Sequence, residues 1–133
     1  MSKALTMSTS RYHKGSLASS FRYALEGLRY VLWVERNARI HLAAAILVAA
    51  VGFWLHLNAL EWALIIIAIA LVFAGEMLNT VIELMVDMIT LEQHPLAKHA
   101  KDVAAGAILV AAIAAAVIGL LVLGPHVWIK LGF

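Results

Sequence analysis

The feature that most constrains this chain is a run of 21 residues without a charge, from Val103 to Leu123. As a helix rising about 1.5 Å per residue, it would be roughly 31 Å long, which matches the hydrocarbon thickness of a bilayer. Apolar residues make up 64% of the 133 residues and charged residues only 14%, whereas soluble domains have about 45–50% and about 25%. The sequence therefore predicts a small all-α integral membrane protein.

Three apolar segments are long enough to span the membrane, and we expect transmembrane helices at about residues 39–57, 62–89 and 101–123. Ahead of them, apolar residues recur at helical spacing. These are Leu17, Phe21, Ala24, Leu25, Leu28 and Leu32. Charged residues fall on the other faces, so we expect an amphipathic helix over about 17–36 on the membrane surface. The first 15 residues are expected to form a flexible basic arm, and residues 16–133 a single membrane-embedded domain.

Basic residues are distributed unevenly along the chain. Seven of the ten Lys and Arg residues precede residue 40, and Lys98 and Lys101 follow the second apolar segment. Because positive charge stays on the cytoplasmic side, we expect the N-terminus and this second loop in the cytoplasm and the C-terminus outside. The basic arm leads directly into apolar segments and suits anionic lipid, so nucleic-acid binding is not expected. We also expect no cleavable leader, since the first apolar run begins only near residue 40.

The second apolar segment continues into a row of polar residues. Glu76 follows fourteen apolar positions, and Asn79, Glu83 and Asp87 lie with it within roughly an 80° arc of one helix. Ionisable groups at membrane depth cost several kcal/mol and are functional by default. Three acids on one face repel each other, and a hard cation such as Mg²⁺, which binds carboxylates together with substrate phosphates, would relieve that repulsion. Glu35, at the junction before the first span, could complete such a metal site.

A second polar cluster follows in the loop before the third span. Pro95 suits the start of a helix, and its first turns would hold Lys98, Lys101 and Asp102. Such a helix start attracts phosphate.

A structural reading of both clusters stays open. The acids could flank the headgroup region and pair with Lys98, Lys101 or Arg39, and His94 and His99 could be interfacial rather than metal ligands. The chain has no cysteine, which excludes disulfides and a cysteine-based zinc site.

The segment from Glu76 to Asp87 resembles the signature of the prokaryotic diacylglycerol kinase family, the small integral membrane lipid kinases. Every fixed position of its E-x-x-N-[ST]-x-x-E-x-x-x-D pattern is matched. The pair Lys101-Asp102 falls where the family has its own Lys-Asp pair, and Gly27-Leu-Arg29 followed by Glu35 also matches. The resemblance covers roughly residues 16–123. It implies three transmembrane helices and an N-terminal surface helix, assembled as a homotrimer with shared sites in the bacterial inner membrane.

The resemblance also implies transfer of the γ-phosphoryl group of ATP to a lipid hydroxyl with Mg²⁺. By position, Glu76 is the catalytic base, and Glu35 and Glu83 are the metal ligands. The implied ATP-binding residues are Tyr23, Glu35, Glu83, Glu92, His94, Lys101 and Asp102, and the site-orienting residues are Asn79 and Asp87.

The acceptor lipid is less closely defined. Ser16 stands where members of the diacylglycerol type carry Arg, and Arg11 or Lys14 could substitute for it. Residues 37–43, together with residues 94–98, look more like the undecaprenol kinase branch, so the resemblance favours undecaprenol over diacylglycerol.

Two other function classes compete with a lipid kinase. One is a proton- or cation-translocating subunit with Glu76 as the intramembrane carrier. The other is a non-catalytic assembly protein whose small-residue helix faces dominate. Translocation does not require the extra acids or the Lys-Asp pair. The sequence has no glycine-rich P-loop or protein-kinase signature, which excludes a soluble-kinase mechanism.

Overall fold

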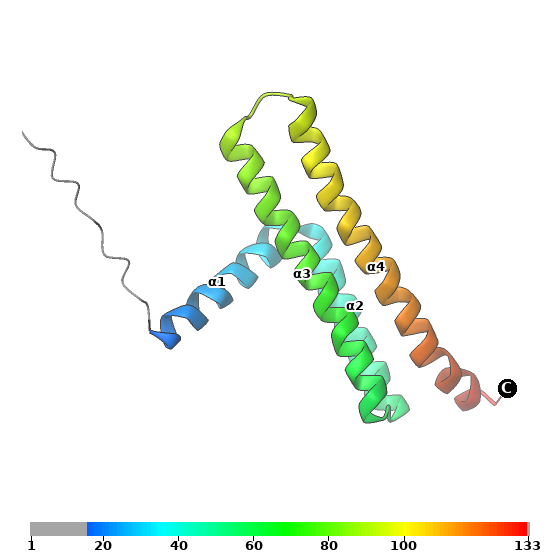
Figure 1. Ribbon diagram of the computed structural model, residues 1–133. Helices are drawn as coiled ribbons and strands as arrows, with labels where there is room; N and C mark the ends of the chain where they lie inside the picture. The colour runs from blue at the N-terminus through cyan, green and yellow to red at the C-terminus, as the bar shows by residue number, and fades with distance from the viewer. Residues whose placement is uncertain (1–15, 133) are drawn as a thin grey trace, which may run out of the picture.

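The computed structural model describes residues 16–132 and contains four helices in this part of the chain (Figure 1). They are α1 (Leu17–Val34), α2 (Arg36–Leu55), α3 (Ala59–Ile89) and α4 (Pro95–Lys130). Helices α2, α3 and α4 are each long and apolar enough to cross a membrane. The predicted all-α class with three spanning helices is therefore confirmed. The predicted basic arm, residues 1–15, lies outside the described residues.

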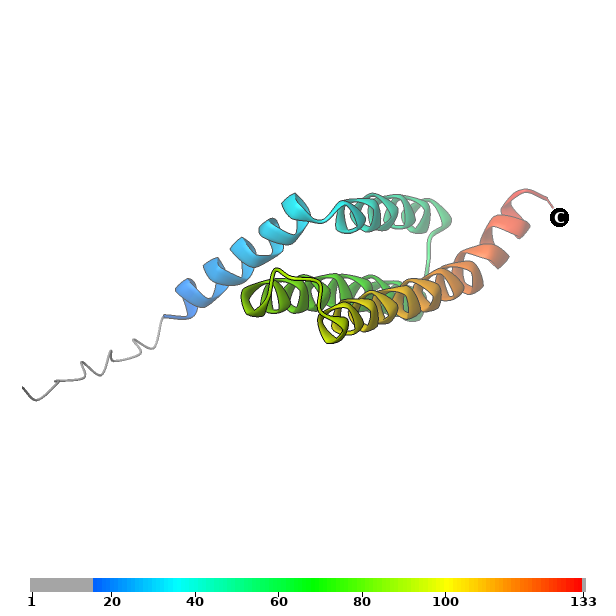
Figure 2. The same cartoon turned by 90° about the horizontal axis from the view of Figure 1, so that it is seen from above.

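The three long helices lie side by side, and α1 leaves the bundle at a steep angle (Figures 1 and 2). Helix α3 packs along α4 over much of its length, while the other helix pairs touch over shorter stretches. Most large apolar side chains of α2, α3 and α4 face outward. An apolar surface of this extent suits lipid or neighbouring subunits rather than water.

A side chain from α2 sets the angle between α1 and α2. The guanidinium of Arg39 donates hydrogen bonds to the backbone oxygens of Leu32, at 3.3 Å, and Trp33, at 2.9 Å. These carbonyls belong to the last turn of α1, where they lack helical partners and carry partial negative charge, so a cation suits them. The intervening residue, Glu35, is in extended backbone and caps both helices.

The turn between α2 and α3 is tight and well capped. His56 ends α2 in the left-handed conformation, with φ 59°. A Cβ atom at Gly52 would lie 3.0 Å from the Trp62 ring, so any larger residue would require that ring to shift by a few tenths of an ångström. Asn58 Oδ1 accepts a hydrogen bond from the Glu61 N–H at 3.0 Å, and Glu61 Oε2 accepts one from the Asn58 N–H at 2.8 Å. This reciprocal capping box fixes the start of α3.

The buried apolar cluster lies near this turn and is formed by Leu55, Leu57, Ile65 and Val122. A hydrogen bond connects the end of α4 to α2: Nζ of Lys130 donates to the backbone oxygen of Trp54 at 2.8 Å. Helix α4 begins at Pro95, as predicted from that residue, but it continues beyond the expected limit of residue 123 to Lys130. The buried apolar cluster thus lies at the end of the bundle opposite the row of acids.

Candidate functional site

Buried polar side chains are concentrated in one stretch of α3. Among residues 16–132, the polar or charged side chains that are buried are Glu76, Asn79 and Thr80. Glu76 is only 1% exposed. Burying a carboxylate is unfavourable unless a donor or cation accompanies it.

The group that faces Glu76 comes from α2. Nε2 of His41 lies 3.3 Å from Oε1 of Glu76. The contact lacks the geometry of a full hydrogen bond, and Oε1 has no hydrogen-bond partner within the described part of the chain. The carboxylate is therefore buried, close to an imidazole, and incompletely satisfied.

Glu35 reaches the same stretch of α3 from the α1–α2 junction. The Thr80 hydroxyl lies 3.4 Å from Oε1 of Glu35 and 3.0 Å from the backbone oxygen of Glu76. Because a hydroxyl has one hydrogen, it donates fully to only one of these acceptors at a time. Thr80 thus places Glu35 beside the helical turn that carries Glu76.

Glu83 is held one turn away from Asn79 on the same helix. Nδ2 of Asn79 donates a hydrogen bond to Oε1 of Glu83 at 3.0 Å. Oδ1 of Asn79 is buried and has no partner among residues 16–132. The amide therefore fixes Glu83 while presenting a free acceptor oxygen of its own.

Glu35 and Glu83, the expected metal ligands, are each held by one of two adjacent residues of α3, Thr80 and Asn79. The described residues include no group of three or more His, Cys, Asp or Glu side chains that could hold a metal. Mg²⁺ commonly takes only one or two carboxylates and completes its shell with substrate phosphates and water. Glu35 and Glu83 supply two carboxylates from the same stretch of the fold, which is the number that such a shell uses.

A second polar region lies at the α3–α4 connection, where a cavity of about 770 Å³ opens. Five of the expected site residues line it: Asp87, Glu92, His94, Lys101 and Asp102. Nζ of Lys101 lies 2.6 Å from Oδ1 of Asp87, so this ion pair joins α4 to α3. The pairing of Asp87 with Lys101 is the contact anticipated by the structural reading of the acids. The cavity nevertheless gathers acid, imidazole and ammonium groups in one place.

The start of α4 forms part of this cavity. His94 caps the helix, and its Nδ1 accepts a hydrogen bond from the Leu96 N–H at 3.2 Å. Helix N-termini carry partial positive charge from unpaired N–H groups, which favours an anion nearby.

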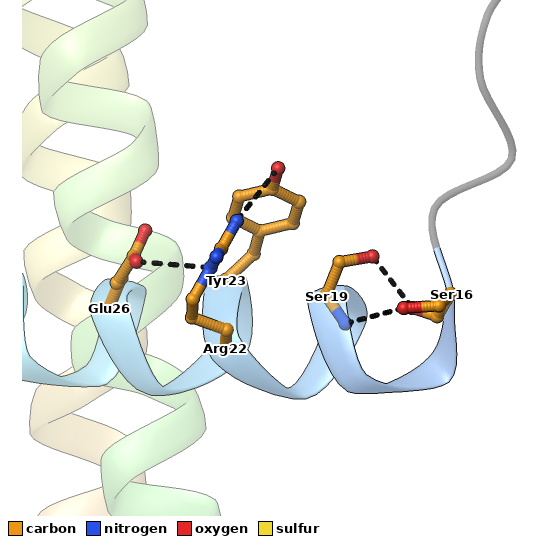
Figure 3. A network of polar contacts seen from close by, with 5 residues as sticks. All are labelled: Ser16, Ser19, Arg22, Tyr23 and Glu26. Carbon is orange, nitrogen blue, oxygen red and sulfur yellow. Dashed lines mark hydrogen bonds and ion pairs between the residues drawn. The ribbon is translucent and has the colours of Figure 1, made fainter.

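Tyr23 is not brought together with these residues within one chain. It lies on α1, 59% exposed, in the half that points away from the bundle (Figures 1 and 3). Its hydroxyl accepts a hydrogen bond from Arg22 at 3.5 Å, and Arg22 also lies 3.7 Å from Glu26. Ser16 caps α1 by accepting a hydrogen bond from the Ser19 N–H at 3.3 Å (Figure 3).

Sequence reasoning assigned no role to His41 or Thr80. Each left a signal that could have been used. His41 is a polar interruption of an apolar segment, and Thr80 lies four residues after Glu76, on the same helical face. The contacts with Glu76 and Glu35 depend on how α2 and α3 pack.

Comparison with known proteins identifies the family. A profile described as prokaryotic diacylglycerol kinase matches residues 22–123. The chain belongs to this family. The matched segment of the diacylglycerol kinase family contains all the expected site residues, from Tyr23 to Asp102.

The similar individual proteins are also lipid kinases. The undecaprenol kinase of Bacillus subtilis (strain 168) is 46% identical over 80% of this chain and 86% of that protein. The diacylglycerol kinase of Synechocystis sp. is 44% identical over 78% of this chain and 60% of that protein. The diacylglycerol kinase of Escherichia coli (strain K12) is 36% identical over 78% of this chain and 85% of that protein. Both acceptor types are thus represented among the relatives.

Proposed function

We propose that this protein is an ATP-dependent membrane lipid kinase that transfers the γ-phosphoryl group of ATP to the hydroxyl of undecaprenol. Diacylglycerol is the second candidate acceptor. The observation that carries the kinase activity is the family match over residues 22–123, which contains the buried row of polar residues on α3. A bilayer-embedded polar site of this kind suits a reaction between a lipid alcohol and a soluble nucleotide.

Glu76 is the proposed catalytic base. A primary alcohol is a poor nucleophile at neutral pH, and a carboxylate within reach of its proton assists the reaction. In the transfer, the hydroxyl proton passes to Glu76 and the alcohol oxygen forms a bond to the γ-phosphorus. The bond from that phosphorus to the β–γ bridging oxygen breaks, and ADP leaves. Burial within α3 keeps the carboxylate away from bulk water, and the unpaired Oε1 is consistent with a partner that arrives with substrate.

The remaining assignments concern the nucleotide. Glu35 and Glu83 would hold Mg²⁺, which supplies neutralisation of phosphate charge when bound. Asn79 orients Glu83, and Asp87 orients Lys101 through their ion pair. Phosphoryl transfer depends mainly on positioning and charge neutralisation, which these residues provide. Nucleotide contacts are assigned to Tyr23, Glu35, Glu83, Glu92, His94, Lys101 and Asp102, most of which line the cavity at the α3–α4 connection.

The choice of undecaprenol depends on local sequence. The identities of 46% to an undecaprenol kinase and 44% to a diacylglycerol kinase are too close to separate the acceptors. Residues 37–43 and 94–98 resemble the undecaprenol kinase branch, and Ser16 departs from the diacylglycerol type.

The proposal includes a placement in the bacterial inner membrane. The N-terminus and the α3–α4 loop lie in the cytoplasm and the C-terminus outside, because basic residues are concentrated in the first two regions. Helix α1 lies on the cytoplasmic surface of the membrane, where its exposed apolar residues, such as Leu17, Phe21 and Leu25, contact lipid. The protein forms a homotrimer, in which the outward apolar faces become interfaces and Tyr23 completes a neighbour's site.

Cation translocation through Glu76 is not favoured. The family match points to phosphoryl transfer, and the carboxylates of Glu35 and Glu83 are held near Glu76 in a way that a single-carrier mechanism does not require.

The deciding experiment offers undecaprenol and diacylglycerol side by side to the purified protein in nanodiscs, at equal mole fraction, with labelled MgATP. We expect label in lipid phosphate with both present, and a higher kcat/KM for undecaprenol. Reactions without Mg²⁺ or without lipid serve as controls. Absence of labelled lipid from either alcohol would contradict the kinase assignment. A higher kcat/KM for diacylglycerol would reverse the choice of acceptor.

A further inference from the structure

Two contacts between histidine and glutamate join helices in the described part of the chain, and they differ in burial. Nε2 of His126 lies 3.4 Å from Oε1 of Glu61, with side chains that are 32% and 21% exposed. Nε2 of His41 lies 3.3 Å from Oε1 of Glu76, with side chains that are 26% and 1% exposed. Glu61 also accepts a backbone hydrogen bond from Asn58, whereas Oε1 of Glu76 has no hydrogen-bond partner among residues 16–132.

The surroundings of Glu76 leave its carboxylate dependent on His41. The nearby Thr80 hydroxyl has the backbone oxygen of Glu76 and the carboxylate of Glu35 as its alternative acceptors, and it does not donate to the Glu76 carboxylate. The imidazole is able to donate through Nε2 when that nitrogen carries the hydrogen, in the neutral ring or in the cation. A donor at this position stabilises the ionised carboxylate, which is the form that can accept a proton.

His41 also borders an apolar groove of about 310 Å³ between α2, α3 and α4. Ala45 of α2, Val72 of α3 and Ala112 of α4 line the same groove. The ring therefore lies between an apolar space and the buried carboxylate. This location lets it fix the orientation of the carboxylate without contacting the nucleotide cavity, whose lining does not include His41.

We propose that His41 is a positioning residue for phosphoryl transfer: its Nε2–H holds Oε1 of Glu76 and leaves Oε2 directed at the acceptor hydroxyl. The inference rests on the proposed function, in which Glu76 is the base. During transfer the hydroxyl proton passes to Oε2 of Glu76, and His41 keeps its own hydrogen. The imperfect geometry of the 3.3 Å contact agrees with this role, because hydrogen bonds to catalytic groups are commonly long without substrate and tighten in the reactive complex.

The test compares His41→Leu with His41→Gln in nanodiscs. Leucine approximates the volume of the ring but has no donor, whereas the glutamine amide restores an N–H. We expect His41→Leu to lower kcat by about 10- to 100-fold, by analogy with the loss seen when a residue that orients a metal-ligating side chain is removed. The KM for MgATP should stay within about twofold, because the change lies outside the nucleotide cavity. His41→Gln should recover kcat to within a few-fold of wild type.

The matched control is His126→Leu, which removes the other histidine–glutamate contact and should leave kcat and both KM values unchanged. All variants are compared per folded protein, and His41→Met replaces His41→Leu if the leucine variant does not fold. Wild-type kcat in the leucine or methionine variant would overturn the inference, as would a glutamine variant no better than leucine. A wild-type protein that phosphorylates no lipid alcohol would instead overturn the proposed function, and this inference with it.

Discussion

The two ends of the helical bundle use similar side chains under different conditions. At the α2–α3 turn, Asn58 and Glu61 complete a capping box, His126 contacts Glu61, and Lys130 donates to the backbone of Trp54. The buried apolar cluster packs beside them. These polar groups have partners, so their contacts stabilise this end of the bundle.

At the other end, polar groups are buried without full satisfaction. Oε1 of Glu76 and Oδ1 of Asn79 have no hydrogen-bond partners in the part of the chain that the structure describes. Buried polar atoms are nearly always paired in folded proteins, and departures from that rule concentrate at functional sites. Glu61 and Glu76 lie on the same helix and each contacts a histidine, but of these two only Glu76 is buried and incompletely paired. The environment of an acid, rather than its presence alone, therefore marks the candidate site.

The largest difference between the two ends is expected when the same substitution is made at Glu76 and at Glu61. Glu76→Gln should lower kcat by about 10²–10⁴-fold, because the amide cannot accept the hydroxyl proton. Glu61→Gln makes the same change at the other end of α3 and should retain wild-type kcat. Phosphorylation of undecaprenol in nanodiscs measures both variants. Equal activity of the two variants would show that burial at Glu76 has no catalytic meaning.

The next largest effect is expected at Glu83. Glu83→Gln keeps the size of the side chain and removes its charge, so the Mg²⁺ concentration for half-maximal rate should rise and kcat should fall by about 10²-fold. Titration of the rate with Mg²⁺ at saturating ATP separates these effects. An unchanged Mg²⁺ requirement would remove Glu83 from the set of metal ligands, and Glu61→Gln again supplies the charge-matched control.

A smaller effect is expected from the lysines at the two ends. Lys101→Met should raise the KM for MgATP by about tenfold, since one hydrogen bond to a charged group is lost. Lys130→Met, which frees the backbone of Trp54 at the other end, should leave that KM unchanged. Steady-state kinetics with varied MgATP test the pair. An equal rise in the KM for MgATP in both variants would place the nucleotide outside the cavity that Lys101 lines.

Elements determined by local sequence could be predicted, and contacts between elements could not. The uncharged run from Val103 to Leu123 predicted a membrane-spanning helix. Pro95 marked the start of α4, because proline suits a first helical turn. The bond between Thr80 and Glu35 joins residues 45 positions apart, so it depends on how α3 packs against the α1–α2 junction. No periodicity within either segment contains that information.

The same distinction applies to α1 and to the candidate site. Spacing along one helix indicated that Glu76, Asn79 and Glu83 share a face, because helical geometry is local. The contact of His41 with Glu76 requires the relative rotation of two helices, which the apolar pattern of a membrane helix specifies weakly because lipid and protein neighbours are both apolar. The angle of α1 likewise depends on Arg39 reaching back to the carbonyls of Leu32 and Trp33.

The smallest effect, and the sharpest test of the stable end, concerns the ion pair of Glu61 and His126. Glutamine at position 61 can still complete the capping box, so Glu61→Gln removes the charge without removing the helix cap. A double-mutant cycle with His126→Leu should give a coupling free energy below about 1 kcal/mol, since partly exposed ion pairs contribute little. Thermal unfolding in detergent measures the cycle. A coupling free energy of several kcal/mol would mean that the Glu61–His126 pair matters as much as the buried contact of His41 with Glu76. The two ends of the bundle would then differ in their chemistry and not in how strongly their histidine–glutamate pairs stabilise the fold.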